Sequence, residues 1–238
     1  MDPAAITATV AGAGAVFAAV GAWGAFVPSS QLFGPTMRQT GHPRAIALTF
    51  DDGPNPAATP ALLDLLEKHG ARATFFMIGR RVREFPKIAA DVIARGHAVG
   101  NHTETHPNLA FQSSRRVAGE LARCHEAISS ATGRDARWMR PPFGGRGPSL
   151  DRTAGAAGIV GVVMWSKWAK DWKVQPAEPV IERLRRVRGG DIVLLHDGDH
   201  RVAQGDRRHT VRAMEYWLPR WKEAGLSFAT VDDWNPKS

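Results

Sequence analysis

The sequence is poor in cysteine and contains one long stretch without charge. Cys124 is the only cysteine, so no disulfide can form within the chain. Its place in a helical pattern predicts a small, buried apolar side chain. Residues 3–37 contain no charged residue. No internal repeat is present, and no low-complexity tract lies outside this N-terminal stretch, which excludes a repeat architecture.

Acidic residues are also in deficit. Lys and Arg number 31 against 23 for Asp and Glu, which gives a formal charge of +8, and the sequence pI is near 10.3. This balance favours attraction to anionic surfaces, such as nucleic acid, phospholipid headgroups or an acidic cell envelope, without choosing among them. The sequence has no basic strand with interleaved aromatics and no recognised nucleic-acid module, so we expect no nucleic-acid partner.

The apolar N-terminal segment, residues 1–30, is nearly continuous in Ala, Val and Gly over residues 4–27. A helix rises about 1.5 Å per residue, so this run is long enough for a bilayer core of roughly 30 Å. It predicts either a membrane anchor over residues 4–27 or a buried appendage, and it lacks the basic region of a secretory signal. The nearest basic residues, Arg38 and Arg44, follow the run, and this charge bias would keep the following domain on the cytoplasmic side. Residues 31–43 are expected to form an irregular linker.

Residues 44–238 are expected to form one domain, because 238 residues with 43% hydrophobic composition suit one substantial core. Short apolar strands alternate with helices, which predicts parallel strands joined by right-handed crossovers. The expected strands are residues 46–50, 73–78, 98–101, 137–140, 159–165, 192–195 and 226–231, and the expected helices are residues 59–70, 82–94, 113–132, 151–158, 178–188 and 210–224. The predicted fold class is therefore α/β, a distorted (β/α)7 barrel with parallel strands and an N-terminal apolar helix.

The first strand ends in two carboxylates. Residues 46–50 are apolar enough for a buried strand, Asp51 and Asp52 follow directly, and the Gly-Pro-Asn-Pro sequence after them cannot continue the strand. Adjacent strand residues point to opposite faces, so the two carboxylates are expected to have different roles. A capping or turn role is the alternative for each of them.

Other polar residues also follow strand ends. They are His102 with His106, Arg140, Asp171, and His196 with Asp197. Each has a structural explanation when it is taken separately. In a parallel α/β barrel, however, the carboxyl ends of the strands converge on the face where active sites are built, so together these residues predict a single site.

The spacing of His102 and His106 suits a metal ion. Four positions apart, their imidazoles can lie on one side of a helical turn, although a structural or surface pair is the alternative. One carboxylate from Asp52 would complete a three-ligand set that leaves a position for water, as in catalytic zinc sites. The same set suits cobalt or nickel. We therefore expect one divalent ion, with zinc as the first choice.

Four segments resemble, in the same order, the motifs of polysaccharide deacetylases, carbohydrate esterase family 4 (CE4). They are Thr49-Phe50-Asp51-Asp52-Gly53-Pro54, His102-Thr103-Glu104-Thr105-His106, Arg140-Pro141-Pro142-Phe143-Gly144 and Leu194-Leu195-His196. The resemblance covers about residues 46–231. It implies a distorted barrel of seven βα units, a deacetylase catalytic domain over residues 44–238, and metal-dependent hydrolysis of N-acetyl or sometimes O-acetyl groups on glycans such as chitin or peptidoglycan.

The resemblance also implies the roles of the site residues. Asp52, His102 and His106 hold the ion, Asp51 accepts the proton of the attacking water, and Arg140 pairs with Asp51. The backbone N–H of Phe143 and the metal stabilise the oxyanion. His196 is the general acid that protonates the leaving nitrogen.

A carboxylate beside His196 is expected to raise the pKa of its imidazole, and Asp171 is the candidate. Family members often carry two Asp three residues apart before a Trp. Here Trp168 stands at the first of these positions, and only Asp171 precedes Trp172. Either Asp171 alone tunes His196, or this part of the resemblance fails.

A pocket for the acetyl methyl group is expected from Trp165, Trp172, Leu194 and Pro142, with a core role as the alternative. Asp197, Asp199 and His200 are interpreted as loop residues or as supports of the site. The expected partner is an acetylated glycan of the cell envelope, and the protein is expected to be membrane-anchored or extracytoplasmic, against the charge bias noted above. The alternatives are a deacetylase of a lipid-linked saccharide at the membrane and a non-catalytic glycan-binding protein. The oligomeric state and the acetyl position are left open.

Overall fold

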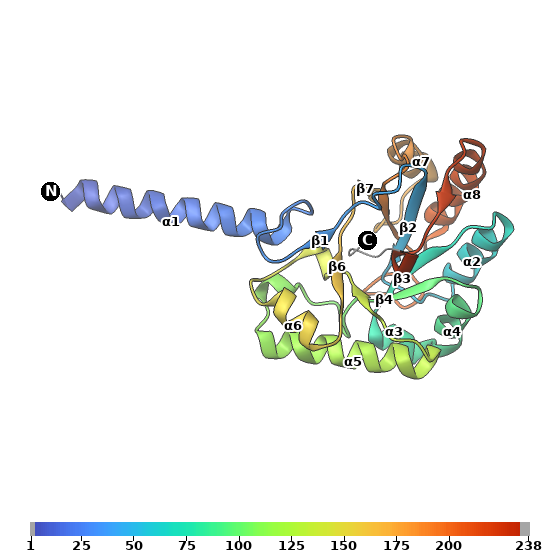
Figure 1. Ribbon diagram of the computed structural model, residues 1–238, viewed down its shortest axis with the longest axis horizontal. Coiled ribbons are helices and arrows are strands. Elements are labelled where there is room, and N and C mark those ends of the chain that lie inside the picture. The colour runs from blue at the N-terminus through green and yellow to red at the C-terminus, as the bar shows by residue number, and fades with distance from the viewer. Residues whose placement is uncertain (1–2, 234–238) are drawn as a thin grey trace.

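The protein is a curled parallel sheet wrapped by helices, with one further helix extending away from it (Figure 1). The structure, a computed structural model, describes residues 3–233, with side chains from residue 14. The strands are β1 (Thr36–Met37), β2 (Ala45–Asp51), β3 (Ala73–Met77), β4 (Ala98–Asn101), β5 (Trp138–Met139), β6 (Gly161–Val163), β7 (Lys167–Trp168), β8 (Ile192–His196) and β9 (Ser227–Phe228). The helices are α1 (Pro3–Phe26), α2 (Thr59–Lys68), α3 (Gly79–Glu84), α4 (Pro86–Ala94), α5 (Ser114–Thr132), α6 (Leu150–Ala156), α7 (Ala177–Leu184) and α8 (Arg208–Glu223), with short 3₁₀ turns η1 (Leu109–Phe111), η2 (Pro142–Gly144) and η3 (Val231–Asp233).

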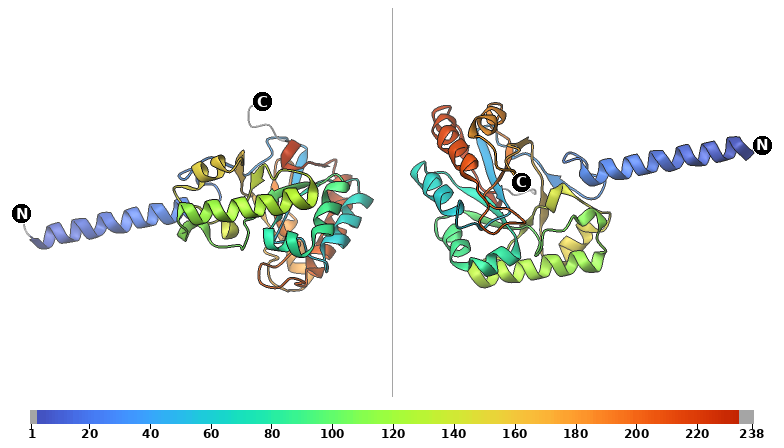
Figure 2. Two further views of the ribbon diagram at one scale, coloured as in Figure 1. Left: turned by 90° about the horizontal axis from the view of Figure 1, so that it is seen from below. Right: turned by 180° about the vertical axis from the view of Figure 1, so that it is seen from behind.

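The sheet forms a half-barrel rather than a closed barrel. Its strand order is β1-β6-β5-β4-β3-β2-β8-β7, and β9 pairs beside β2. All ladders between these strands are parallel. Strands β1 and β7 stand at opposite ends of the order and, among the described residues, do not pair, and an isolated bridge between Gln39 and Asp191 links the two ends of the curl. Helices α2 to α8 surround its outside in both further views (Figure 2).

The core forms around β2, in which every residue is buried. A parallel strand is covered on both faces, which explains its continuous apolar run. On one side Phe50 stacks on Phe75 of β3, with ring centroids 5.0 Å apart. On the other side β2 pairs with β8 in a register that sets Asp51 opposite His196. The same pairing that builds the core therefore brings two predicted site residues together.

The predicted strands correspond to β2 to β6, β8 and β9. Two strands were missed: β1, which lies in the predicted irregular linker, and β7. Each has only two residues. The helix expected over residues 82–94 is two helices, α3 and α4, because Pro86 cannot continue a helix and instead begins a new one. The last predicted strand shrinks to Ser227–Phe228.

The N-terminal helix α1 projects away from the half-barrel in all three views (Figures 1 and 2). The side chains of residues 4–13, which fall within the predicted anchor, lie outside the described part of the structure. In the described part of the chain, no helix combines the length and the apolar character that a membrane crossing requires. Membrane anchoring through residues 4–27 therefore stays a prediction.

A buried arginine fastens the C-terminal end of α1 to the domain. Arg146 is 1% exposed, and its guanidinium donates to the backbone oxygens of Ser30 and Val27 at 2.8 and 2.7 Å. Its backbone N–H donates to the oxygen of Ala25 at 3.0 Å. A cation is favoured at a helix C-terminus, where backbone carbonyls lack helical partners. Arg146 closely follows η2, so α1 is tied to the segment that contains Phe143.

Candidate active site

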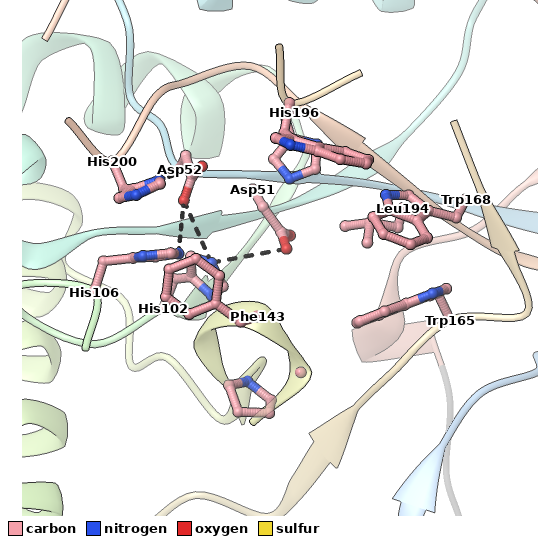
Figure 3. Close-up of a pocket in the computed structure, with 13 residues that line it drawn as sticks. Asp51, Asp52, His102, His106, Phe143, Trp165, Trp168, Leu194, His196 and His200 are labelled. Atoms are coloured by element: carbon pink, nitrogen blue, oxygen red, sulfur yellow. Dashed lines mark ion pairs between the residues drawn. The ribbon is translucent and has the colours of Figure 1, made fainter. Parts of the chain in front are cut away.

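A cavity of about 320 Å³ opens at the carboxyl ends of the central strands. Figure 3 shows its side chains, which come from segments far apart in the sequence. The lining residues are Asp51, Asp52, His102, His106, Pro141, Phe143, Gly144, Trp165, Trp168, Trp172, Leu194, His196 and His200. The predicted convergence of strand-end residues on one face thus occurs.

Asp52, His102 and His106 form one cluster in this cavity. Oδ1 of Asp52 lies 3.5 Å from Nε2 of His102 and 3.1 Å from Nε2 of His106. One donor atom from each residue lies within 4.8 Å of the others. The two imidazoles do not share a helical turn as the spacing suggested. They extend from a loop in which both Thr103 and His106 have a positive φ.

Side-chain hydrogen bonds fix this loop. The side chain of Asn101 accepts the N–H of Thr103 at 2.9 Å, and the hydroxyl of Thr103 accepts the N–H of His106 at 3.1 Å. Glu120 of α5, which is fully buried, accepts both the N–H and the hydroxyl of Thr105. Positive φ values at Asp52 (73°), Thr103 (66°), His106 (62°) and Phe143 (57°) are unusual for residues other than glycine. Side chains before, within and after this segment therefore hold the loop in place.

The donor set fits a cation. Nδ1 of His102 lies 2.7 Å from the backbone oxygen of Arg140, and since a carbonyl only accepts, Nδ1 carries the hydrogen. In the neutral ring, Nε2 then presents a lone pair to Oδ1 of Asp52, which is itself an acceptor. Among the described residues, this buried Oδ1 has no hydrogen-bond partner. An ion between two such acceptors would satisfy both.

The protonation states of the cluster also suit a metal. Burial raises the pKa of Asp52, but contacts with His102, His106 and His200 outweigh burial and hold this pKa well below its ordinary value. Burial lowers the pKa of His106, which favours the neutral ligand form. Burial also lowers the pKa of His102, but the charge of Asp51, assisted by Asp52, raises it overall. A proton and a metal ion therefore compete for Nε2 of His102.

Asp51 and Arg140 form a second, separate pair. Nη1 of Arg140 lies 2.8 Å from Oδ1 of Asp51 and also donates to Thr49. The guanidinium is fully buried and donates further to the backbone oxygens of Val163 and Met164. Because all three nitrogens of its guanidinium are engaged, Arg140 holds one oxygen of Asp51 in a fixed direction. The other oxygen, Oδ2, lies 3.8 Å from Nε2 of His102.

His196 and Asp171 form the third pair, and His196 lines the same cavity. Nδ1 of His196 lies 2.8 Å from Oδ1 of Asp171, whose Oδ2 accepts the backbone N–H of His196 and the hydroxyl of Thr210. Burial lowers the pKa of His196, but the charge and hydrogen bond of Asp171 outweigh burial and raise this pKa to about 9. Asp171 makes these contacts alone, and Trp168 lines the cavity.

The aromatic side of the cavity differs from the prediction in one residue. Trp165, Trp172 and Leu194 line it as expected, but Pro142 does not, and Pro141 lines it instead. Pro142 is buried at the start of η2. Phe143 lines the cavity and is 55% exposed.

Sequence reasoning missed Trp168 and His200 as cavity residues. The ring of His200 stacks on that of His106, with centroids 4.3 Å apart, and its Nδ1 lies 3.8 Å from Oδ2 of Asp52. Neither residue stood at a ligand spacing. Asp197 lies behind the cavity as a support: it is fully buried, accepts the hydroxyl of Thr59, and has its pKa raised to about 7 by burial.

Comparison with known proteins gives consistent results. The polysaccharide deacetylase family model matches residues 38–162. A chitooligosaccharide deacetylase of Azorhizobium caulinodans is 35% identical over 204 residues, which cover 82% of this chain and 97% of that protein. The crystal structure of a peptidoglycan N-acetylglucosamine deacetylase in complex with a substituted benzamide superposes with a TM-score of 0.77 at 29% identity, covering 83% of this chain and 91% of the other. A CE4 pseudoenzyme from Bacillus anthracis superposes with a TM-score of 0.75 at 28% identity, covering 84% and 68%.

Proposed function

The chain belongs to the polysaccharide deacetylase family, and from this premise we propose that it is a metal-dependent de-N-acetylase of glycans that contain N-acetylglucosamine. One observation carries the proposal. The cluster of Asp52, His102 and His106 shares a single cavity with the carboxylate of Asp51 and the imidazole of His196. A scissile amide in this cavity therefore meets a base on one flank and an acid on the other.

Asp52, His102 and His106 are the residues that would hold the ion. Zinc is the first choice for such a set, with cobalt or nickel as alternatives. When bound, the ion would supply polarisation of the acetyl carbonyl and a lower pKa for the attacking water. The chain's own part is to keep Asp52 ionised and both imidazoles pointed at one position by the contacts described above.

Asp51 is placed to accept the proton of the attacking water. Its Oδ1 is occupied by Arg140, so Oδ2 is the oxygen left for this proton. The bond from Arg140 also fixes the direction in which the carboxylate of Asp51 faces. As water adds to the acetyl carbon, charge develops on the carbonyl oxygen, and the backbone N–H of Phe143 donates to it.

His196 then delivers a proton to the leaving nitrogen. An amine is a poor leaving group unless it is protonated, and a pKa of about 9 keeps the imidazolium charged at neutral pH. Asp171 holds Nδ1, so Nε2 is the atom left for the proton transfer. Hydrolysis of an amide depends more on a general acid than hydrolysis of an ester does. The presence of His196 therefore favours N-acetyl over O-acetyl substrates. Trp165, Trp172 and Leu194 receive the acetyl methyl group and exclude water.

The substrate we propose is a cell-envelope polysaccharide of the chitin or peptidoglycan type, since the relatives are named for these substrates. The test is acetate release from N-acetylglucosamine oligomers and from peptidoglycan, with and without a chelator, by wild type and by Asp51→Asn. We expect release that stops on chelation and returns on addition of zinc. Activity that survives both chelation and Asp51→Asn would contradict the proposal.

A second candidate keeps the chemistry but moves it to a lipid-linked saccharide at a membrane. The charge of +8 and the uncharged N-terminal segment favour it. The uncharged segment also motivates our proposal that the protein is anchored in a membrane, and the envelope glycans on which the family usually acts motivate a position outside the cytoplasm, against the charge bias around the segment. Equal turnover of soluble glycans by a protein recovered in soluble fractions would count against this candidate. A reporter fused to the C-terminus would determine the side of the membrane on which the domain lies.

A non-catalytic glycan-binding role is the third reading, and one structural neighbour is described as a pseudoenzyme. The base, the acid and the three candidate ligands are all present here and meet in one cavity. Turnover of any acetylated glycan would eliminate this reading.

A further inference from the structure

The open edge of the half-barrel lies directly beside the active site. Strand β7 ends the strand order, and among the described residues no strand pairs beyond it. Trp168 belongs to this edge strand and is 38% exposed. Its indole stacks on that of Trp172, with centroids 4.8 Å apart and planes 23° apart. A partly exposed aromatic pair therefore stands at the edge of the cavity, next to the end of the sheet.

Three hollows of the surface meet at Trp168. The first is the catalytic cavity, where Figure 3 shows Trp168 next to Leu194. The second, of about 400 Å³, lies between β7 and the end of α7. The third, of about 230 Å³, lies against the linker and contains Arg38. Trp168 lines all three, so a ligand that extends from the cavity in this direction must pass over its indole.

The hollow beside α7 is strongly cationic. It is lined by Lys167, Lys170, Arg183, Arg185 and Arg186 and by one acidic residue, Glu182. Glu182 is neutralised by Arg185 at 2.7 Å, and Lys167 lies 3.9 Å from Asp191. Among the described residues, Lys170, Arg183 and Arg186 form no ion pair. Lys170 also lies near the indole of Trp168, with Nζ 5.6 Å from the ring centroid.

These features select a particular ligand chemistry. An indole face packs against the apolar face of a sugar ring, and Lys and Arg that are not neutralised bind carboxylate or phosphate. We propose that Trp168 and the cations of the α7 hollow form a subsite for an acidic glycan, in which the sugar next to the acetylated one stacks on Trp168 and its anionic group lies near Lys170 and Arg186. The inference deepens the proposed function and rests on it for the position of the acetylated sugar.

The test measures affinity separately from hydrolysis, on metal-loaded protein with the substitution Asp51→Asn. The probes are three tetrasaccharides of N-acetylated sugars: neutral chitotetraose, a tetrasaccharide with lactyl carboxylates on alternate sugars, and chitotetraose with a terminal phosphate. We expect Kd to be about tenfold lower for one or both anionic probes, with a difference that shrinks as salt is added. A preference for only one of them identifies the carboxylate or the phosphate as the source of the anion.

Variants assign the preference to residues. Lys170→Gln with Arg186→Gln should reduce the anion preference about fivefold. Arg115→Gln makes a similar change at an exposed position on α5, on the opposite side of the half-barrel from α7 (Figure 1), and should leave the preference intact. Trp168→Ala should weaken the binding of all three probes about tenfold, and Trp168→Phe should restore part of the lost affinity. Tyr216→Ala, at a similarly exposed aromatic of α8, is the control.

Equal affinities for the three probes would overturn the proposal. So would an anion preference that survives Lys170→Gln with Arg186→Gln, or affinities that Trp168→Ala leaves unchanged. Acetate release by the wild type is assayed in parallel. If no acetate is released from any glycan, the proposed function is wrong. The affinities for the three probes still show whether the subsite exists.

Discussion

Asp171 grips His196 at two points: one carboxylate oxygen lies 2.8 Å from Nδ1 of the ring, and the other accepts the backbone N–H at 2.9 Å. The ring and its backbone therefore cannot move independently. The same carboxylate outweighs the effect of burial and raises the pKa of His196 to about 9. The protonation state of His196 in the reaction can therefore be tested through Asp171.

The first prediction concerns pH. A general acid is active only while it is protonated, so kcat/KM of the wild type should fall as pH rises through about 9. Asp171→Asn removes the charge that raises the pKa, so the alkaline limb should move down toward or below the ordinary histidine value of about 6.5. The measurement is the pH profile of kcat/KM for both proteins. Asp206→Asn, which changes a carboxylate outside the cavity, should leave the limb in place, and an unmoved limb in Asp171→Asn would exclude the assigned role.

The second prediction concerns the metal. His102→Ala should weaken zinc binding by at least about 100-fold, because one of three ligands is lost. Zinc affinity of the wild type should also fall with decreasing pH, since the raised pKa of His102 makes the proton a competitor. Competition with a chelating dye measures both effects without an activity assay. His125→Ala, on α5 away from the cavity, is the matched control, and an equal loss in this control would refute the assignment.

The third prediction separates base from ligand. Asp51→Asn should lower kcat about 10²- to 10⁴-fold, because the carboxylate that takes the proton of water is lost. Zinc affinity should change little, since Asp52 and not Asp51 belongs to the ligand cluster. Zinc affinity is measured by dye competition and kcat by acetate release, both on the same preparation. A loss of zinc binding as large as that of His102→Ala would show that Asp51 is itself a ligand.

The fourth prediction concerns the attachment of α1. Arg146→Met removes two hydrogen bonds to the backbone oxygens of Val27 and Ser30, and the buried carbonyls lose their donors. We expect a loss of about 1–3 kcal/mol, which corresponds to roughly 2–4 °C in Tm per kcal/mol for a domain of this size. Thermal unfolding measures the shift. Arg115→Met, an exposed arginine on α5, should change Tm by much less, and equal shifts in both variants would contradict the clamp.

The sequence was sufficient where burial and chain order decide the structure. The strand β2 could be predicted because residues 46–50 are apolar enough for a buried strand, and all of β2 is buried. Asp51, Asp52, His102, His106 and His196 could be brought together because parallel strands present their carboxyl ends on one face. These inferences need only a local pattern and a topological rule.

Features that depend on tertiary partners could not be predicted in this way. The two-residue strands β1 and β7 exist only through pairing with β6 and β8. The loop from His102 to His106 takes left-handed conformations that side chains of distant segments stabilise, so a helical turn was the wrong expectation. Trp168 and His200 reach the cavity because of where the open edge and the loop after β8 lie. The sequence placed Trp168 beside a motif and His200 in a loop after β8, but neither position has a pattern that predicts contact with the cavity.

The residues of the active site with left-handed backbone conformations affect how the enzyme loses activity. Asp52, Thr103, His106 and Phe143 each hold a conformation that costs of the order of 1–3 kcal/mol, and together this is comparable with the net stability of a whole domain, about 5–15 kcal/mol. Contacts with neighbouring residues hold these strained conformations only while the surrounding packing is intact. Warming or mild denaturant should therefore disorder the loops at these four positions before the sheet unfolds. Inactivation and global unfolding are then two separate events. The resistance of the protein to inactivation depends on these loops rather than on the sheet.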